Sequence, residues 1–159
     1  MSDMPRNTIH SAEAERSLLG CLFRRNDDLG DAQAFIRGEE DFYIFANRCV
    51  YRGILELSQK GQAFDPVTLA HWLNSQKLIE DVGGHAYLAE LWDAAPTIDT
   101  PRYAKIVQEF ALLRGLVVAA DETIKDVENR AGPTDELVGR AEQRFFELST
   151  IRQTKKARH

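Results

Sequence analysis

The sequence predicts an all-α fold, with a globular bundle of short helices (the head) followed by a long helical hairpin. Three observations predict it. Apolar residues recur at spacings of three and four along residues 103–127, and a second apolar stripe follows in residues 134–149. No segment shows the sustained alternation with a period of two that is typical of a half-buried strand.

The longest periodic segment has the pattern of a heptad seam. Strict alternation of three and four keeps one narrow stripe of a helix facing a partner helix, because a straight helix has about 3.6 residues per turn. The pattern therefore predicts one long helix with an apolar seam. Its residues are Tyr103, Ile106, Phe110, Leu113, Val117, Ala120, Ile124 and Val127.

A second helical arm follows a break at residues 130–133, which contain Gly132 and Pro133. Thr134 is predicted as its N-cap, with carboxylates in the first turn at the positive end of the helix dipole. We expect the two stripes to face each other in a hairpin of residues 102–149, with the second arm the shorter. The second stripe comprises Leu137, Val138, Ala141, Phe145, Phe146 and Leu148.

Apolar residues off the seam, Leu112, Leu116 and Val118, leave surface that one hairpin does not cover. Dimerisation is the natural expectation. Docking of this surface on the rest of the chain is an equally open alternative.

The head is predicted to span residues 11–101. Ser11 is the expected N-cap of a first helix beginning at Ala12, and a short helix is expected over residues 31–37. One helical turn at residues 39–42 precedes a helix over residues 46–60, which Gly61 ends.

Two further helices complete the head. Asp65 followed by Pro66 is a strong start signal for a helix that runs to residue 76. A short helix is expected over residues 85–93, after the break at Gly83 and Gly84. Residues 1–10 are predicted to be a flexible N-terminus, and residues 150–159 to begin a linker.

Composition narrows the functional classes. The 159 residues are 43% hydrophobic and carry a formal charge of −5, which suits one core and a protein partner better than a duplex-binding surface. The basic residues near the C-terminus are predicted to be a solvated tail. No apolar run approaches the roughly 20 residues of a membrane span. Cys21 and Cys49 without metal-ligand spacing predict reduced thiols in a cytoplasmic protein.

Catalytic and cofactor chemistry is not predicted for this chain. A glycine-rich loop followed by Lys and Ser or Thr, which cradles nucleotide phosphates, does not occur, and the four histidines show no zinc-ligand spacing. Glu13 and Glu15 diverge by about 200° on a helix, so they cannot flank one substrate atom. We expect both to favour the N-terminus of the first helix.

Several short motifs occur in a specific order. They are EAERSLLG at residues 13–20, EDFY at 40–43, DPVTL at 65–69, VGGHAYL at 82–88, APT at 95–97, YAKIV at 103–107 and AEQRFFEL at 141–148. In this order they resemble the N-terminal domain of DnaB-type replicative DNA helicases, over residues 11–149. The resemblance implies a helical head and hairpin.

The family implies an assembly role rather than catalysis. Its hairpins pair between subunits, and a trimer of dimers forms a collar on the hexameric helicase that helps dock the helicase-binding domain of primase. ATP, Mg²⁺ and DNA translocation belong to a RecA-like C-terminal motor, which is absent from this chain. The resemblance thus implies a piece of a bacterial or phage helicase that meets DNA only through the full-length hexamer.

Site residues are carried over by position. The resemblance assigns hairpin pairing to Phe110, Leu113, Val117 and Ala120, opposed by Leu137, Ala141, Phe145 and Leu148. It points to Glu13, Tyr87, Val117 and Ile124 for primase contact.

This sequence departs from the family at three positions. Asn47 stands where a histidine is common, and Phe110 and Gly115 stand where basic residues are common. A glycine inside a helix costs about 1 kcal/mol relative to alanine, so Gly115 predicts a close helix crossing or a kink.

A rival interpretation is a free-standing regulator or decoy that resembles the collar and binds an intact helicase or its loader. The sequence alone does not separate the two. Direct binding of single-stranded DNA is a third possibility, which the acidic charge disfavours.

Overall fold

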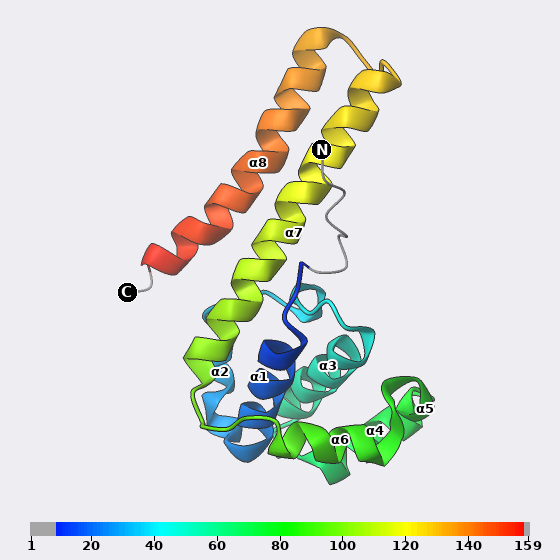
Figure 1. Ribbon diagram of the computed structural model, residues 1–159, viewed down its shortest axis with the longest axis vertical. Helices are drawn as coiled ribbons and strands as arrows, with labels where there is room; N and C mark the ends of the chain where they lie inside the picture. The colour runs from blue at the N-terminus through cyan, green and yellow to red at the C-terminus, as the bar shows by residue number, and fades with distance from the viewer. Residues whose placement is uncertain (1–8, 158–159) are drawn as a thin grey trace. The chain divides into compact units, whose positions relative to one another are not determined.

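The computed structural model describes residues 9–157, and side-chain surroundings through Ile151. These residues form eight α-helices and two 3-10 turns, and no strand occurs within the described range. The elements are α1 (Ala12–Arg24), η2 (Asn26–Asp28), α2 (Leu29–Gln33), η3 (Glu39–Asp41), α3 (Phe45–Gln59), α4 (Pro66–Ser75), α5 (Ile79–Val82), α6 (Gly84–Asp93), α7 (Thr100–Glu128) and α8 (Thr134–Ala157) (Figure 1). The predicted all-α class is confirmed.

The described residues divide into two compact units, a head over His10–Glu109 and a hairpin unit that contains residues 110–157 together with Ile9. The division lies inside α7, further along the chain than the boundary expected at residue 101. The first turns of α7 belong to the head because Tyr103, Ala104 and Val107 are buried in its core.

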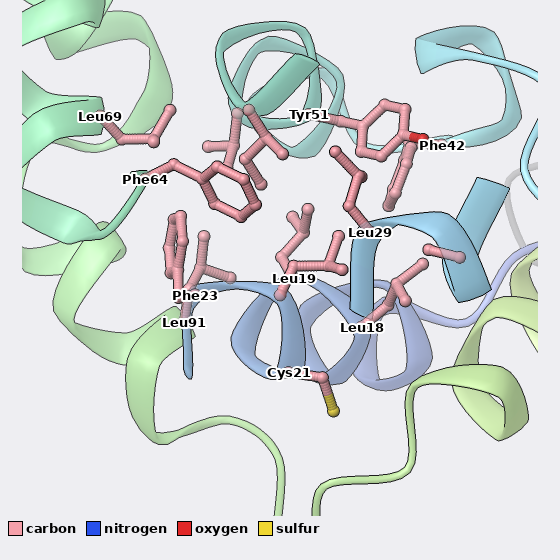
Figure 2. Packing of buried hydrophobic residues seen from close by; sticks show 14 of the residues in the cluster. Leu18, Leu19, Cys21, Phe23, Leu29, Phe42, Tyr51, Phe64, Leu69 and Leu91 are labelled. Atoms are coloured by element: carbon pink, nitrogen blue, oxygen red, sulfur yellow. The ribbon is translucent and has the colours of Figure 1, made fainter. Parts of the chain in front are cut away.

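The head is built around α1, whose Leu18, Leu19 and Leu22 are fully buried. Figure 2 shows side chains of α1 among Phe42, Tyr51, Phe64 and Leu69, which come from segments far apart in the sequence. A helix buried on most of its surface must meet several neighbours at once. Helices α1, α3, α4 and α6 therefore share one apolar core.

Gly20 allows α1 and α6 to approach closely. A Cβ atom at this position would meet the backbone oxygen of Leu91 well inside van der Waals contact. Only glycine fits without displacing one of the two helices.

The predicted helix starts are confirmed at Ser11 and Asp65. The Ser11 hydroxyl accepts a hydrogen bond from the Ala14 amide at 3.1 Å. Asp65 and Thr68 form a reciprocal capping box ahead of α4, with Thr68 N donating to Asp65 Oδ1 at 2.8 Å. Both motifs satisfy amides that have no partner within their own helix.

Three helices end in Schellman motifs, in which a left-handed residue lets the next amide reach back to the last turn. Gly61 takes this position after α3, as its glycine predicted, with Gln62 N donating to Leu57 O at 2.9 Å. The same role falls to Lys77 after α4 and to Arg130 after α7, with φ of 59° and 47°. Neither side chain favours that conformation.

Several boundaries differ from expectation. Helix α2 covers Leu29–Gln33 instead of residues 31–37, because Gly30 lies inside the helix rather than in a loop. Helix α5 was not expected. Helix α8 continues to Ala157, past the predicted end at Ser149 and through most of the predicted linker.

Residues 1–8 of the predicted flexible N-terminus, which spans residues 1–10, lie outside the described residues. Its last residue, His10, is placed in the head, where the imidazole stacks on Tyr43 with ring centroids 4.2 Å apart.

Candidate assembly and docking surfaces

The two arms of the hairpin meet along a face of α7 that carries small and polar residues. A Cβ atom on Gly115 would lie 2.7 Å from Leu148 Cδ2 of α8, which confirms the close helix crossing predicted at this glycine. Thr123 and Asp126, further along the same face, accept hydrogen bonds from Arg144 of α8. Ala119, which lies between Gly115 and Thr123 on this face, is buried.

The predicted seam does not supply this contact. Positions two apart on a helix diverge by about 200°, so Val117 lies nearly opposite Gly115 on α7. Leu113 and Ile124 are 49% and 53% exposed, and Ala120 is also exposed. The expectation that the two apolar stripes face each other within the chain is therefore wrong for most of α7.

The residues assigned to pairing are thus split by exposure. Within one chain Phe110 and Val117 are half-buried, whereas Leu113 and Ala120 are exposed. On α8, Leu137, Ala141 and Leu148 are half-buried, and Phe145 is exposed. Val138 and Phe146 add two more large apolar side chains to the exposed surface of this arm.

An apolar groove lies between the arms near the hairpin loop, with a volume of about 820 Å³. Thr123 and Val127 line it from α7, and Val138, Ala141 and Phe145 line it from α8. We call it the tip groove. Its other lining residues are Arg130, Gly132, Thr134, Leu137 and Glu142.

A cluster of ion pairs, which we call the Arg144 clasp, joins the arms beside the groove. Arg144 Nη2 lies 2.5 Å from Asp126 Oδ2, its Nε lies 3.2 Å from Glu122 Oε2, and its Nη1 donates to Thr123 Oγ1 at 3.2 Å. The side chains of Arg144 and Asp126 are 21% and 20% exposed. One arginine thus makes three polar contacts across the hairpin.

The head contains a buried polar network that the sequence did not reveal. Glu15 accepts hydrogen bonds from the amides of Tyr43 and Ile44 at 2.8 and 3.2 Å, and from Asn47 Nδ2 at 3.0 Å. The Tyr87 hydroxyl donates to Asn47 Oδ1. The carboxylate of Glu15 therefore holds the segment that leads into α3, in addition to its expected place in the first turn of α1.

Burial and this network act in opposite directions on the pKa of Tyr87, because desolvation raises it and the hydrogen bond with Asn47 lowers it. Desolvation is the largest cause that raises the pKa of Tyr87, to about 12. Its hydroxyl is engaged by Asn47, so its ring rather than its polar tip is what a partner could meet.

The four residues predicted for primase contact are not brought together in one unit. Glu13, exposed, and Tyr87, half-buried, belong to the head, whereas Val117 and Ile124 belong to the hairpin unit.

The DnaB-like helicase N-terminal domain model matches residues 7–109. The chain belongs to this family. It is 34% identical over 140 residues to the replicative DNA helicase DnaB of Geobacillus stearothermophilus, covering 87% of this chain and 31% of that protein. It is 32% identical over 143 residues to the replicative DNA helicase DnaC of Bacillus subtilis, covering 89% of this chain and 31% of the relative.

Solved structures agree with the family assignment. The N-terminal domain of the DnaB helicase from Mycobacterium tuberculosis superposes with a TM-score of 0.80 and 35% identity, covering 87% of this chain and 97% of that one. A DnaB-like replicative helicase, described with its interactions with primase, has the same fold with a TM-score of 0.69 and 20% identity, over 87% of this chain and 30% of that one. The chain spans about a third of the length of the curated relatives that it matches.

None of the described helices is long and apolar enough to cross a membrane. Among the same residues, no three His, Cys, Asp or Glu side chains are grouped to hold a metal ion.

Proposed function

We propose that this chain is the collar module of a hexameric replicative DNA helicase, which assembles subunits by hairpin pairing and helps dock primase. The exposed apolar seam of α7 carries the proposal. Leu113 and Ile124 point away from the arm that their own chain supplies, so a second copy is the natural partner for this side of the helix.

The charges around the hairpin fit pairing of two copies. A two-fold interface brings a surface against its own copy, so charges on it pair favourably only when both signs are present. Arg130 and Glu142 both line the tip groove, together with the apolar side chains of both arms. Leu137, Ala141 and Phe145, which line it too, belong to the residues predicted for pairing.

The same charge placed at two exposed positions, one in the seam and one outside it, tests the pairing. Leu113→Glu places a charge in the seam and is expected to shift the molar mass in light scattering to that of a monomer, because burying an unpaired charge costs several kcal/mol. Asn129→Glu adds the same charge at an exposed position off the seam and should leave the mass unchanged. An unchanged oligomer in Leu113→Glu would sink the assignment of the seam.

Primase docking rests on likeness to a helicase whose structure was described with primase interactions. We propose Glu13, Tyr87, Val117 and Ile124 as contact residues for the helicase-binding domain of primase. Titration of that domain against Glu13→Ala and Ile124→Ser, monitored by calorimetry, should show weaker binding in both. Affinities equal to that of the unaltered chain would remove these residues from the interface.

The motor functions belong to the proposed parent protein. We propose that ATP and Mg²⁺ are bound by a RecA-like domain outside this chain, that the chain alone hydrolyses no ATP, and that it meets DNA only through the hexamer. Retention of a labelled single-stranded oligonucleotide by the isolated chain would contradict the last point. ATP turnover that co-purifies with the chain through successive columns would contradict the second.

A further inference from the structure

We propose that the Arg144 clasp sets the width of the tip groove, so that screening its charges with salt loosens the groove. The clasp and the groove occupy opposite flanks of the same helix pair. Glu122 and Asp126 of α7 lie on the clasp flank, whereas Thr123 and Val127, each one residue further on, line the groove.

The arrangement on α8 matches that on α7. Arg140 and Arg144 form one row on the clasp flank, since residues four apart lie on the same side of a helix. Val138, Glu142 and Phe145 form the edge of the groove on the other side. Rotation or displacement of α8 about the clasp therefore opens or narrows the groove.

Thr123 links the two flanks. Its hydroxyl accepts a hydrogen bond from Arg144 Nη1 at 3.2 Å and donates to the Ala119 carbonyl at 2.8 Å, while its side chain also lines the groove. Movement of the guanidinium thus reaches the groove wall through one side chain.

The face of α7 that meets α8 carries small side chains. Gly115, Ala119 and Thr123 give α7 a small surface against α8, so the ion pairs carry more of the fastening than they would beside leucine or phenylalanine. Arg144 and Asp126 are partly exposed, and salt screens such pairs less than fully exposed charges but more than buried ones.

Arg140 provides a matched control on the same helix. Its strongest contact, at 2.6 Å, is with Glu136 of its own helix, and its approach to Asp126 across the hairpin is 3.9 Å. Loss of Arg140 removes one positive charge without removing the close contacts between the arms.

The distance between the arms can be measured with paired spin labels. We would introduce cysteines at the exposed positions Lys125 and Gln143 and dilute the labelled protein with unlabelled protein to suppress signals between chains. Native Cys21 and Cys49 are buried, and burial raises the pKa of both thiols, so the labels go to the introduced sites.

The expected result is a narrow distance distribution at low salt that broadens in about 1 M NaCl, where the screening length falls to roughly 3 Å. Arg144→Met should show the broad distribution already at low salt, with helical circular dichroism retained, and Arg140→Met should resemble the parent. A distribution in Arg144→Met as narrow as in the parent, or a parent unaffected by salt, would overturn the inference. The importance of the groove rests on the proposed function, but the distance measurement does not. A strictly monomeric chain would end the pairing proposal, and the distance between the arms could still be measured in it.

Discussion

The head and the hairpin unit bury their apolar residues to very different extents. In the head, large side chains such as Leu18, Leu19 and Tyr51 are almost completely inaccessible, whereas the only buried residues described in the hairpin unit are Ala111 and Ala119. Of the large apolar side chains that are exposed among the described residues, eight belong to the hairpin unit and three to the head. The head satisfies its own core, and the hairpin retains an apolar surface suited to a partner.

This difference predicts that damage to the head costs stability, whereas damage to the hairpin surface costs association. Four tests can break or sharpen this comparison.

The Glu15 network should give the largest effect. Glu15→Ala leaves two backbone amides and Asn47 without their acceptor, and each unsatisfied buried group costs about 1–3 kcal/mol, so we expect a loss of about 4 kcal/mol in the free energy of unfolding. Urea denaturation measures it. Glu13→Ala, two residues away and exposed, should change the value by less than about 0.5 kcal/mol. Equal losses in both variants would refute the role assigned to the buried hydrogen bonds of Glu15.

Gly20 and Gly30 form a matched pair within the head. Gly20→Ala should lower the free energy of unfolding by about 3 kcal/mol, because the new methyl group would press on the Leu91 carbonyl. Gly30→Ala, which has open space and lies in α2, should be neutral or stabilise by up to about 1 kcal/mol. Thermal unfolding of both variants distinguishes crowding from a general effect of glycine replacement.

Alkaline pH should weaken the head selectively. Burial raises the pKa of Tyr51 and Tyr87 to about 12 from a usual value of 10.0, so the native state holds these protons more tightly than the unfolded chain. The stability they contribute is fully present below pH 10 and declines as the pH rises toward 12, by about 2–3 kcal/mol for the fully buried Tyr51.

Tyr51→Phe tests this pH dependence. It should flatten the decline of the unfolding free energy between pH 10 and 12, measured by denaturation at several pH values. A decline that is as steep in this variant as in the parent would show that another group titrates.

The left-handed residues after α4 and α7 should give the smallest effects. Arg130→Gly and Lys77→Gly are each expected to raise the free energy of unfolding by up to about 1 kcal/mol, because glycine adopts these dihedral angles without steric cost. The reverse change at the corresponding position after α3, Gly61→Ala, should lower it by a similar amount. Chemical denaturation of the three variants checks the signs, and destabilisation by Arg130→Gly would mean that the arginine side chain makes a contact worth more than the strain.

Local features of the fold could be predicted from the sequence, whereas contacts between distant segments could not. Ser11, Asp65 and Gly61 act within a few residues of their own position, and their roles were predicted correctly. Lys77 and Arg130 take a conformation that their side chains disfavour, so no residue signal marked them. Helix α5 is a single turn, too short for periodicity to appear.

The sites show the same division. Glu15 lies two residues from Glu13 in the sequence, and its role became apparent only when α3 and α6 were placed beside it. On α7, the apolar periodicity identified a continuous stripe of residues, but the expectation that this stripe faces α8 of the same chain was wrong for most of the helix. The sequence signal for the face of α7 that meets α8 was the set of small residues at 115, 119 and 123, which are spaced four apart.

The central claim is that the hairpin surface left exposed by one chain is covered by another. Its most direct test is the molar mass of the unaltered protein, measured by light scattering over a wide range of concentration. We predict growth from monomer to dimer and toward hexamer as concentration rises. A constant monomer mass up to the highest concentration would contradict the account.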